Sequence, residues 1–146
     1  MNLTLFCLVL FMYSANVGML MTIIPLYSIA VIGADEIFVG FIISAYAPSF
    51  VLASPLWGTA SDRFGRKRML IFGMLVYSAI VFMFSLAGSP LQMVVIRLIE
   101  GFVDASFWTV PFALVADFYV PERMGEAMGK IGAFQSAGLI AGPLLG

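Results

Sequence analysis

The chain has 146 residues, of which 62% are hydrophobic and 10% are charged, and its formal net charge at pH 7 is -1. A soluble domain is roughly half apolar and about a quarter charged, so this composition excludes a soluble globular enzyme and an intrinsically disordered chain. Seven Lys and Arg against eight Asp and Glu leave no basic surface for nucleic acid. There is no His, the commonest general base and metal ligand, and Cys7 is the one cysteine, so an internal disulfide and a multi-cysteine zinc site are excluded. We therefore expect a membrane protein that is not an enzyme and uses no metal and no cofactor.

Charged residues divide the chain into uncharged runs that are long enough to cross a bilayer. A spanning helix needs about 20 mostly apolar residues. Charge-free runs cover residues 1–34, 37–61 and 69–96, and a Gly-Ser-Pro turn at 88–90 divides the third. These breaks predict five transmembrane helices, at approximately 5–31, 38–60, 68–87, 91–116 and 127–146. Because the runs lack the alternation of barrel strands, we expect an all-α membrane protein with a single transmembrane domain over 1–146.

Basic residues set the predicted orientation. The loop at 62–68 carries four Lys and Arg against one Asp, whereas the preceding loop carries only Asp35 and Glu36. The positive-inside rule places 62–68 in the cytoplasm, together with the loop at 117–130 and the N-terminus. We expect a multi-pass protein of the cell (plasma) membrane. The last apolar run, 131–146, ends without a polar exit, so we also expect a fragment of a longer chain with more helices following.

The turn between the second and third predicted helices carries the most informative pattern. Gly58 allows another backbone to approach the helix end, and Gly65 allows a tight reversal of the chain. Asp62 would be unfavourable alone near the membrane surface, but Arg63 and Arg66 can balance its charge. The simplest interpretation is a charged hairpin that only sets the topology.

A narrower interpretation comes from the order and spacing of these residues. They resemble motif A of the major facilitator superfamily of secondary transporters, Gly-x-x-x-Asp-Arg-x-Gly-Arg-Lys. The motif positions are filled by Gly58, Asp62, Arg63, Gly65, Arg66 and Lys67. The resemblance implies that Asp62 and Arg66 pair with Asp117 at the cytoplasmic end of the fourth helix. It also implies that this loop contacts the C-terminal half of the transporter, a partner missing from this sequence.

Two further stretches resemble motifs of the same superfamily. Residues 97–101 are similar to motif B, Arg-x-x-Gln-Gly, with Glu100 in place of the usual Gln. Residues 138–146 are similar to the antiporter motif C. Its positions are filled by Gly138, Gly142, Pro143 and Gly146. The resemblance implies five helices of the N-terminal six-helix bundle of a twelve-helix transporter, close to the drug/proton antiporter branch.

Three charged residues lie within the fourth predicted helix. Arg97, Glu100 and Asp104 are spaced i, i+3 and i+7, so they share one helix face. Intramembrane charges usually face a bundle interior or a watery cavity. One interpretation is a structural Arg97–Glu100 pair with Asp104 hydrogen-bonded or protonated. The other is a transport pathway in which Asp104 or Glu100 exchanges the coupling proton, and the proton can belong to the pair of carboxyls together.

Weaker signals mark other polar and glycine positions. Asn16, Tyr46 and Gln135 are candidates for lining a substrate pathway, although such residues more often serve packing. The glycines of the fifth helix recur every four residues and allow a neighbouring helix to come close, and Pro143 would bend that helix. Ordinary helix packing accounts for this pattern equally well. In antiporters of the resembled family, the same bend and strip seal the fifth helix against the opposite half.

The resemblance implies a secondary transporter that works by alternating access, with the lipid bilayer, a small-molecule substrate and protons as partners. Motif C favours antiport, that is, efflux of a drug-like or other small solute. The alternatives are a symporter or facilitator of sugars or organic acids from the same superfamily, and a truncated membrane fragment that transports nothing.

Overall fold

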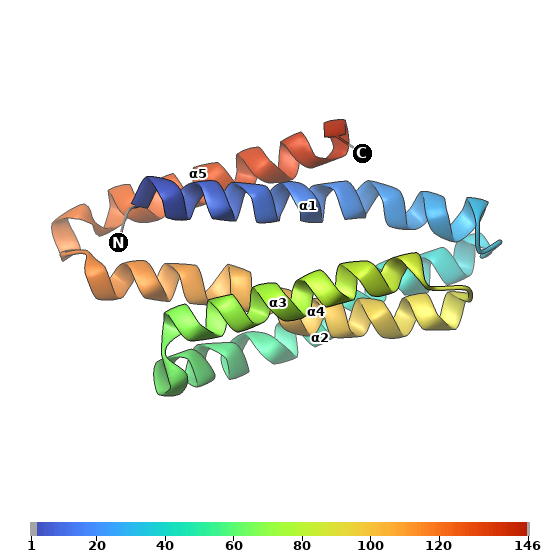
Figure 1. The fold of residues 1–146 in the computed structure, drawn as a ribbon, viewed down its shortest axis with the longest axis horizontal. Helices are drawn as coiled ribbons and strands as arrows, with labels where there is room; N and C mark the ends of the chain where they lie inside the picture. Colours follow the sequence, from blue (N-terminus) through green and yellow to red (C-terminus); the bar gives the residue numbers. More distant parts are fainter. Residues whose placement is uncertain (1–2, 146) are drawn as a thin grey trace. The chain divides into compact units, whose positions relative to one another are not determined.

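The computed structural model of the protein describes residues 3–145. Within these residues it contains five helices and no strand, which confirms the all-α prediction (Figure 1). The helices are α1 (Leu3–Ala30), α2 (Glu36–Phe64), α3 (Arg66–Ser85), α4 (Pro90–Phe118) and α5 (Pro121–Leu145).

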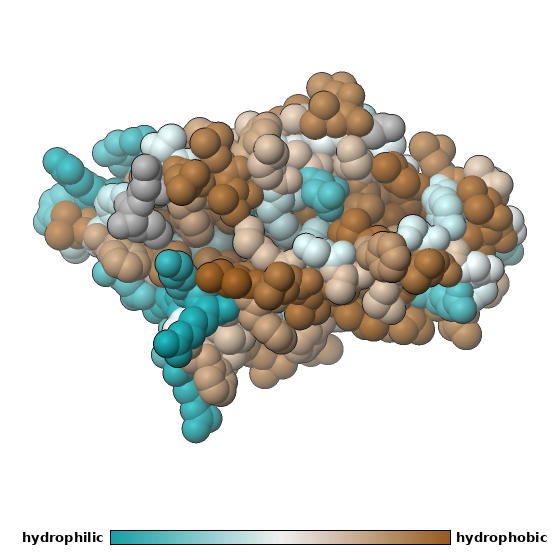
Figure 2. Space-filling model, viewed as in Figure 1, coloured by the Kyte–Doolittle hydropathy of each residue, from teal (hydrophilic) through white to brown (hydrophobic). Residues whose placement is uncertain are grey.

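Four of the helices, α1 to α4, are long and apolar enough to cross a membrane. Large apolar side chains are exposed along them, including Leu52 and Leu75 at 71% and 69% exposure. Apolar residues cover much of the face shown in Figure 2. Such a surface suits lipid and not water, so the protein is a multi-pass membrane protein.

The fifth helix has a different character from the other four. It begins at Pro121, six residues before the start predicted at 127, because Pro suits the first helical position and Glu122 follows in the first turn. Its exposed first part carries the Lys130–Glu126 ion pair, with Nζ 2.6 Å from Oε1. This hydrogen bond with Lys130 lowers the pKa of Glu126. A fifth crossing by the remaining residues, up to Leu145, stays a prediction.

The described residues group into two compact units, and the single transmembrane domain expected over 1–146 stays a prediction. One unit is the continuous segment Tyr27–Ala113, and the other combines the segments before Tyr27 and after Ala113. The first unit therefore holds α2, α3 and most of α4, and the second holds most of α1 together with α5.

Sharp local signals define the boundaries of α2. Asp35 is its N-cap and accepts a hydrogen bond from Phe38 N at 2.8 Å, as short polar side chains do at helix starts. Gly65 is the one residue between α2 and α3, and its φ of 94° lies in the region that side chains avoid. Its N–H bonds Ser61 O at 3.0 Å. The chain reverses there, so α2 and α3 run antiparallel (Figure 1).

Within the segment Tyr27–Ala113, α2 and α3 both pack on α4. Trp57 Nε1 of α2 donates to Phe102 O of α4 at 2.6 Å. On the other side, the rings of Tyr77 in α3 and Phe107 in α4 meet edge to face, with centroids 6.1 Å apart. A methyl group at Gly73 would overlap Ser106 Oγ, so α3 approaches α4 closely there. These contacts fix the rotation of α4 about its axis, and with it the direction of the face that carries the charged residues.

In the second unit, α1 and α5 lie side by side (Figure 1). A methyl group at Gly138 would overlap the carbonyl oxygen of Phe11, and one at Gly142 would overlap that of Ala15. Gly18 provides the same space from the α1 side, against the backbone of Leu139. Close approach at small residues is the usual way in which helices associate in membranes.

Candidate functional site

Charged side chains of α4 form the centre of the candidate site. Arg97, Glu100 and Asp104 are 6%, 2% and 1% exposed. The helix face that the three residues share is therefore buried. Arg97 Nη1 lies 2.6 Å from Glu100 Oε2. The structure thus contains the ion pair that the i, i+3 spacing predicted, and it leaves Asp104 outside that pair.

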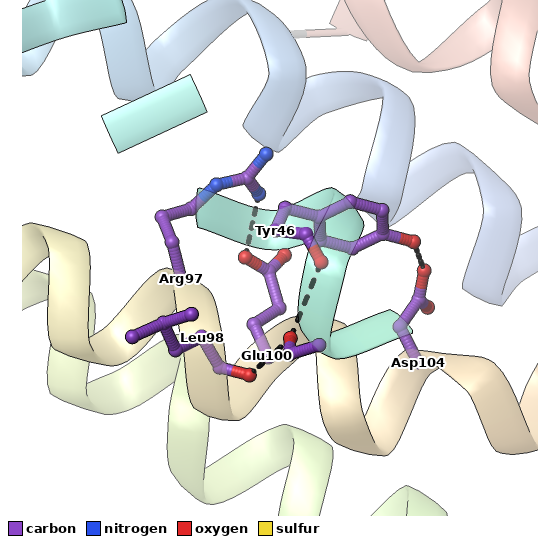
Figure 3. Close-up of polar contacts among 6 residues, drawn as sticks. Tyr46, Arg97, Leu98, Glu100 and Asp104 are labelled. Atoms are coloured by element: carbon purple, nitrogen blue, oxygen red, sulfur yellow. Dashed lines mark hydrogen bonds and ion pairs between the residues drawn. The ribbon is translucent and has the colours of Figure 1, made fainter. Parts of the chain in front are cut away.

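A residue of α2 connects the two parts of this cluster. The hydroxyl of Tyr46 donates a hydrogen bond to Asp104 Oδ2, and the Arg97 guanidinium carbon lies 4.9 Å from the centre of the Tyr46 ring. Figure 3 shows Tyr46 between Arg97 and Asp104, above Glu100. An arginine over an aromatic face is attracted by the ring quadrupole. The three charged residues and Tyr46, here called the α4 cluster, form one connected polar site.

The backbone of α2 is held against α4 at this point. A methyl group at Gly101 would overlap the carbonyl oxygen of Tyr46, so glycine permits the approach. Ser49 Oγ donates to Leu98 O at 2.6 Å and lies 3.2 Å from Tyr46 O. Gly101 and Ser49 therefore position Tyr46, and no sequence argument had assigned them this role. The signal for Gly101 was its place in motif B, and Ser49 gave none.

Two buried polar atoms of the α4 cluster have no hydrogen-bond partner among the described residues. They are Asp104 Oδ1 and Arg97 Nε. Trp108, one turn beyond Asp104 on α4, interacts with the same carboxyl group, but no donor reaches Oδ1 in hydrogen-bond geometry. A buried carboxylate normally has all its oxygens paired, so Oδ1 is an open position.

The charges of the α4 cluster do not cancel when all its groups are ionised. One guanidinium and two carboxylates leave a net charge of -1 in a buried place, and one bound proton makes the sum zero. Along α2 and α3 no other Asp, Glu, Lys or Arg lies between residues 37 and 61 or 69 and 85. A role of these carboxyl groups in proton exchange stays a prediction.

The motif A residues surround the turn from α2 to α3. Asp62 Oδ1 lies 3.0 Å from Arg66 Nη2, while Arg63 and Lys67 are exposed. The hydrophilic residues that protrude beside this turn are visible in Figure 2. Gly58 lies near Thr109 of α4, because a methyl group added at Gly58 would lie 3.9 Å from Thr109 Cγ2. Asp117 belongs to the other unit, and its pairing with Asp62 and Arg66 stays a prediction.

The remaining predicted residues belong to the unit formed by α1 and α5. Gln135 is buried on α5 and Asn16 is half-buried on α1, so a pathway role for either stays a prediction. Gly138 and Gly142 contact α1, as described above, and Pro143 of α5 is exposed. Gly146 lies outside the described residues. A seal between α5 and an opposite half also stays a prediction.

Comparison with known proteins identifies the family. The pattern that defines the Major Facilitator Superfamily matches residues 6–146. The staphyloferrin B transporter of Staphylococcus aureus is 30% identical over 145 residues, which are 93% of this chain and 33% of that relative. Multidrug resistance protein 2 of Bacillus subtilis is 31% identical over 135 residues, which are 92% and 33%. Quinolone resistance protein NorA of Staphylococcus aureus is 26% identical over 139 residues, which are 94% and 35%.

A multi-pass helical membrane protein with a buried charged cluster is therefore the class that the fold and the site define. The chain belongs to the Major Facilitator Superfamily. It spans about a third of the length of the curated relatives named above.

Proposed function

We propose that the chain is the first five helices of a secondary transporter that exports a small drug-like solute in exchange for protons by alternating access. Two of the relatives are named for resistance to drugs or quinolones, and a third is named as a transporter of staphyloferrin B. Transporters of this kind place substrate and ion sites near the middle of the bilayer, between repeated helix bundles. Protons, the solute, the lipid bilayer and a C-terminal half are its proposed partners.

The observation that carries this proposal is the α4 cluster. Burial of a cluster with one surplus negative charge is unfavourable, and binding one proton relieves it. Asp104 is the proposed carrier, because Arg97 already pairs with Glu100 and Asp104 Oδ1 is open. Alternating exposure of this carboxyl to the two sides would couple proton entry to solute exit.

Transport in inverted membrane vesicles tests the proposal. The product of the whole reading frame that encodes these residues is produced in a bacterial host without its own drug pumps. The vesicles are energised with a proton gradient, and ethidium uptake and the collapse of the gradient are recorded together. We expect ethidium to enter and to release protons, and we expect Asp104→Asn to reduce the coupled proton flux at least tenfold.

Glu36→Gln is the matched control, because it removes an exposed carboxylate at the start of α2 without touching the α4 cluster. We expect this variant to transport as the wild type does. Equal proton coupling in wild type and Asp104→Asn would contradict the role of Asp104. Solute entry that follows its own gradient and ignores protons would favour the symporter and facilitator alternatives.

The orientation and location belong to the same proposal. The turn from α2 to α3 lies on the cytoplasmic side of the cell membrane, together with the N-terminus, because Arg and Lys gather at that turn. In the cytoplasm, this turn is placed to contact the C-terminal half.

A further inference from the structure

The Tyr46 hydroxyl is the one hydrogen-bond donor that the described residues supply to Asp104 Oδ2 from another helix. Such a bond favours the ionised form of the acceptor, because a carboxylate accepts a hydrogen bond more strongly than a neutral acid does. Asp104 is 1% exposed, so water cannot easily replace that donor.

We propose that Tyr46 is a positioning residue that sets the pH at which Asp104 exchanges its proton and ties this exchange to the α2–α4 contact. The inference concerns the protonation equilibrium of Asp104 itself. It rests on the proposed function only where that equilibrium is given a role in transport. It assigns to Tyr46 a role different from lining a substrate pathway.

The position of the Tyr46 hydroxyl depends on backbone contacts, and this makes the bond sensitive to helix movement. Gly101 allows the Tyr46 carbonyl to rest against α4, and Ser49 bonds the α4 backbone beside it. A shift of α2 along α4 would therefore carry the hydroxyl away from Asp104. Conversely, protonation of Asp104 would exchange a charge-assisted hydrogen bond for a weaker neutral one and loosen this contact.

The ring of Tyr46 gives the same residue a second attachment. Arg97 lies over the ring at 4.9 Å from its centre and pairs with Glu100. Tyr77 of α3 also interacts electrostatically with Glu100. Among the described residues of α2, α3 and α4, these are the titratable and charged groups near Asp104, and Trp108 of α4 also interacts with its carboxyl group. Removal of the hydroxyl alone leaves the ring under Arg97, so the hydroxyl effect can be measured separately.

Infrared titration of the reconstituted full product tests the inference. The carbonyl band of a protonated carboxylic acid is followed with pH, and the band that disappears in Asp104→Asn is assigned to Asp104. We expect Tyr46→Phe to move the midpoint of this band to higher pH by about one unit or more, since a hydrogen bond to a charged group is worth about one to two such units. Replacement of Tyr46 by 3-fluorotyrosine, a more acidic phenol, should move the midpoint to lower pH.

Tyr27→Phe is the matched control, because it removes a tyrosine hydroxyl that bonds the carbonyl of Ala87 at 3.2 Å. This variant should leave the Asp104 midpoint within about 0.3 of a pH unit of the wild type, well under the shift of one unit expected for Tyr46→Phe. An unchanged midpoint with 3-fluorotyrosine or with a folded Tyr46→Phe protein would overturn the inference, as would an Asp104 band that does not titrate. Vesicle transport is scored separately, so a shifted midpoint without transport would reject the proposed function and retain the role of Tyr46.

Discussion

Arg97 shows how a single residue is tolerated in an apolar helix. Its guanidinium is buried, yet it has a carboxylate on one side and an aromatic face on the other. Removing one member of a buried ion pair leaves the other charge without compensation, which costs far more than replacing both. Arg97 and Glu100 thus stabilise each other in this buried place, independently of any role of the neighbouring Asp104.

This reasoning predicts a non-additive response to substitution. Arg97→Met should lower the free energy of unfolding by about 3 kcal/mol, because Glu100 is left as an uncompensated buried charge. The double variant Arg97→Met with Glu100→Gln should recover most of that loss. Reversible unfolding of the protein in detergent micelles measures all the variants. If the two single effects simply add in the double variant, the pair does not stabilise the α4 cluster in this way.

The partner of Asp104 could not be predicted from the sequence, although the acid itself could. Helical spacing placed Arg97, Glu100 and Asp104 on one face because that argument needs only one helix. Tyr46 was predicted only as a weak pathway candidate, since hydropathy does not fix the rotation of α2 about its axis. The contact depends on the approach at Gly101, which is a property of two helices together.

At the scale of whole elements, α1 and α5 pair through small residues. The recurrence of glycine in α5 indicated a close helix neighbour, but a recurrence every four residues does not say which helix it is. The structure places Gly138 and Gly142 against α1. Helix starts were predictable to different degrees, because charge breaks mark the ends of apolar runs but do not reveal a polar first turn such as that at Pro121.

The α1–α5 contact predicts a position-specific effect of an added methyl group. Gly142→Ala should destabilise the protein by about 1 to 3 kcal/mol, because the new Cβ overlaps the carbonyl of Ala15 and the helices must separate. Gly132→Ala is the control on the same helix, where nothing lies within 4 Å. This control should be neutral or stabilising, since Ala favours a helix over Gly by about 0.5–1 kcal/mol. Melting curves in micelles compare the two, and equal effects would reject the packing account.

The turn between α2 and α3 predicts a second glycine effect with a different cause. No neighbour would contact a methyl group at Gly65, but its φ of 94° is strained for any other residue. Gly65→Ala should therefore cost about 1–3 kcal/mol through backbone strain. Gly40→Ala, in an open position inside α2, should not. A Gly65→Ala protein that melts with the wild type would show that the turn relaxes without cost.

At the scale of the whole molecule, the apolar surface and the distribution of charge define how the protein meets its surroundings. Four helices are long and apolar enough to cross a membrane, while the Arg and Lys residues at the turn from α2 to α3 favour water. Composition alone sufficed to predict this property, because a chain with so few charges cannot cover itself for water.

The predicted topology can be tested with single cysteines in a Cys7→Ala background, since Cys7 is the one native cysteine. A membrane-impermeant maleimide should label Glu36→Cys in intact cells and Lys67→Cys only in inverted vesicles. Both positions are exposed, with Glu36 at the start of α2 and Lys67 just after its end. Labelling of Lys67→Cys in intact cells would contradict the predicted orientation of the protein.

The unit that joins α1 to α5 has a consequence for biosynthesis. The first segment of this unit leaves the ribosome before Tyr27, but its second segment emerges only after Ala113. At about 5–20 residues per second, we expect several seconds to pass before α5 can cover the side of α1 that it contacts. The continuous segment in between has all its own contacts available earlier. We therefore expect the nascent chain to assemble in order, with the segment Tyr27–Ala113 packing first and the α1–α5 contact forming last.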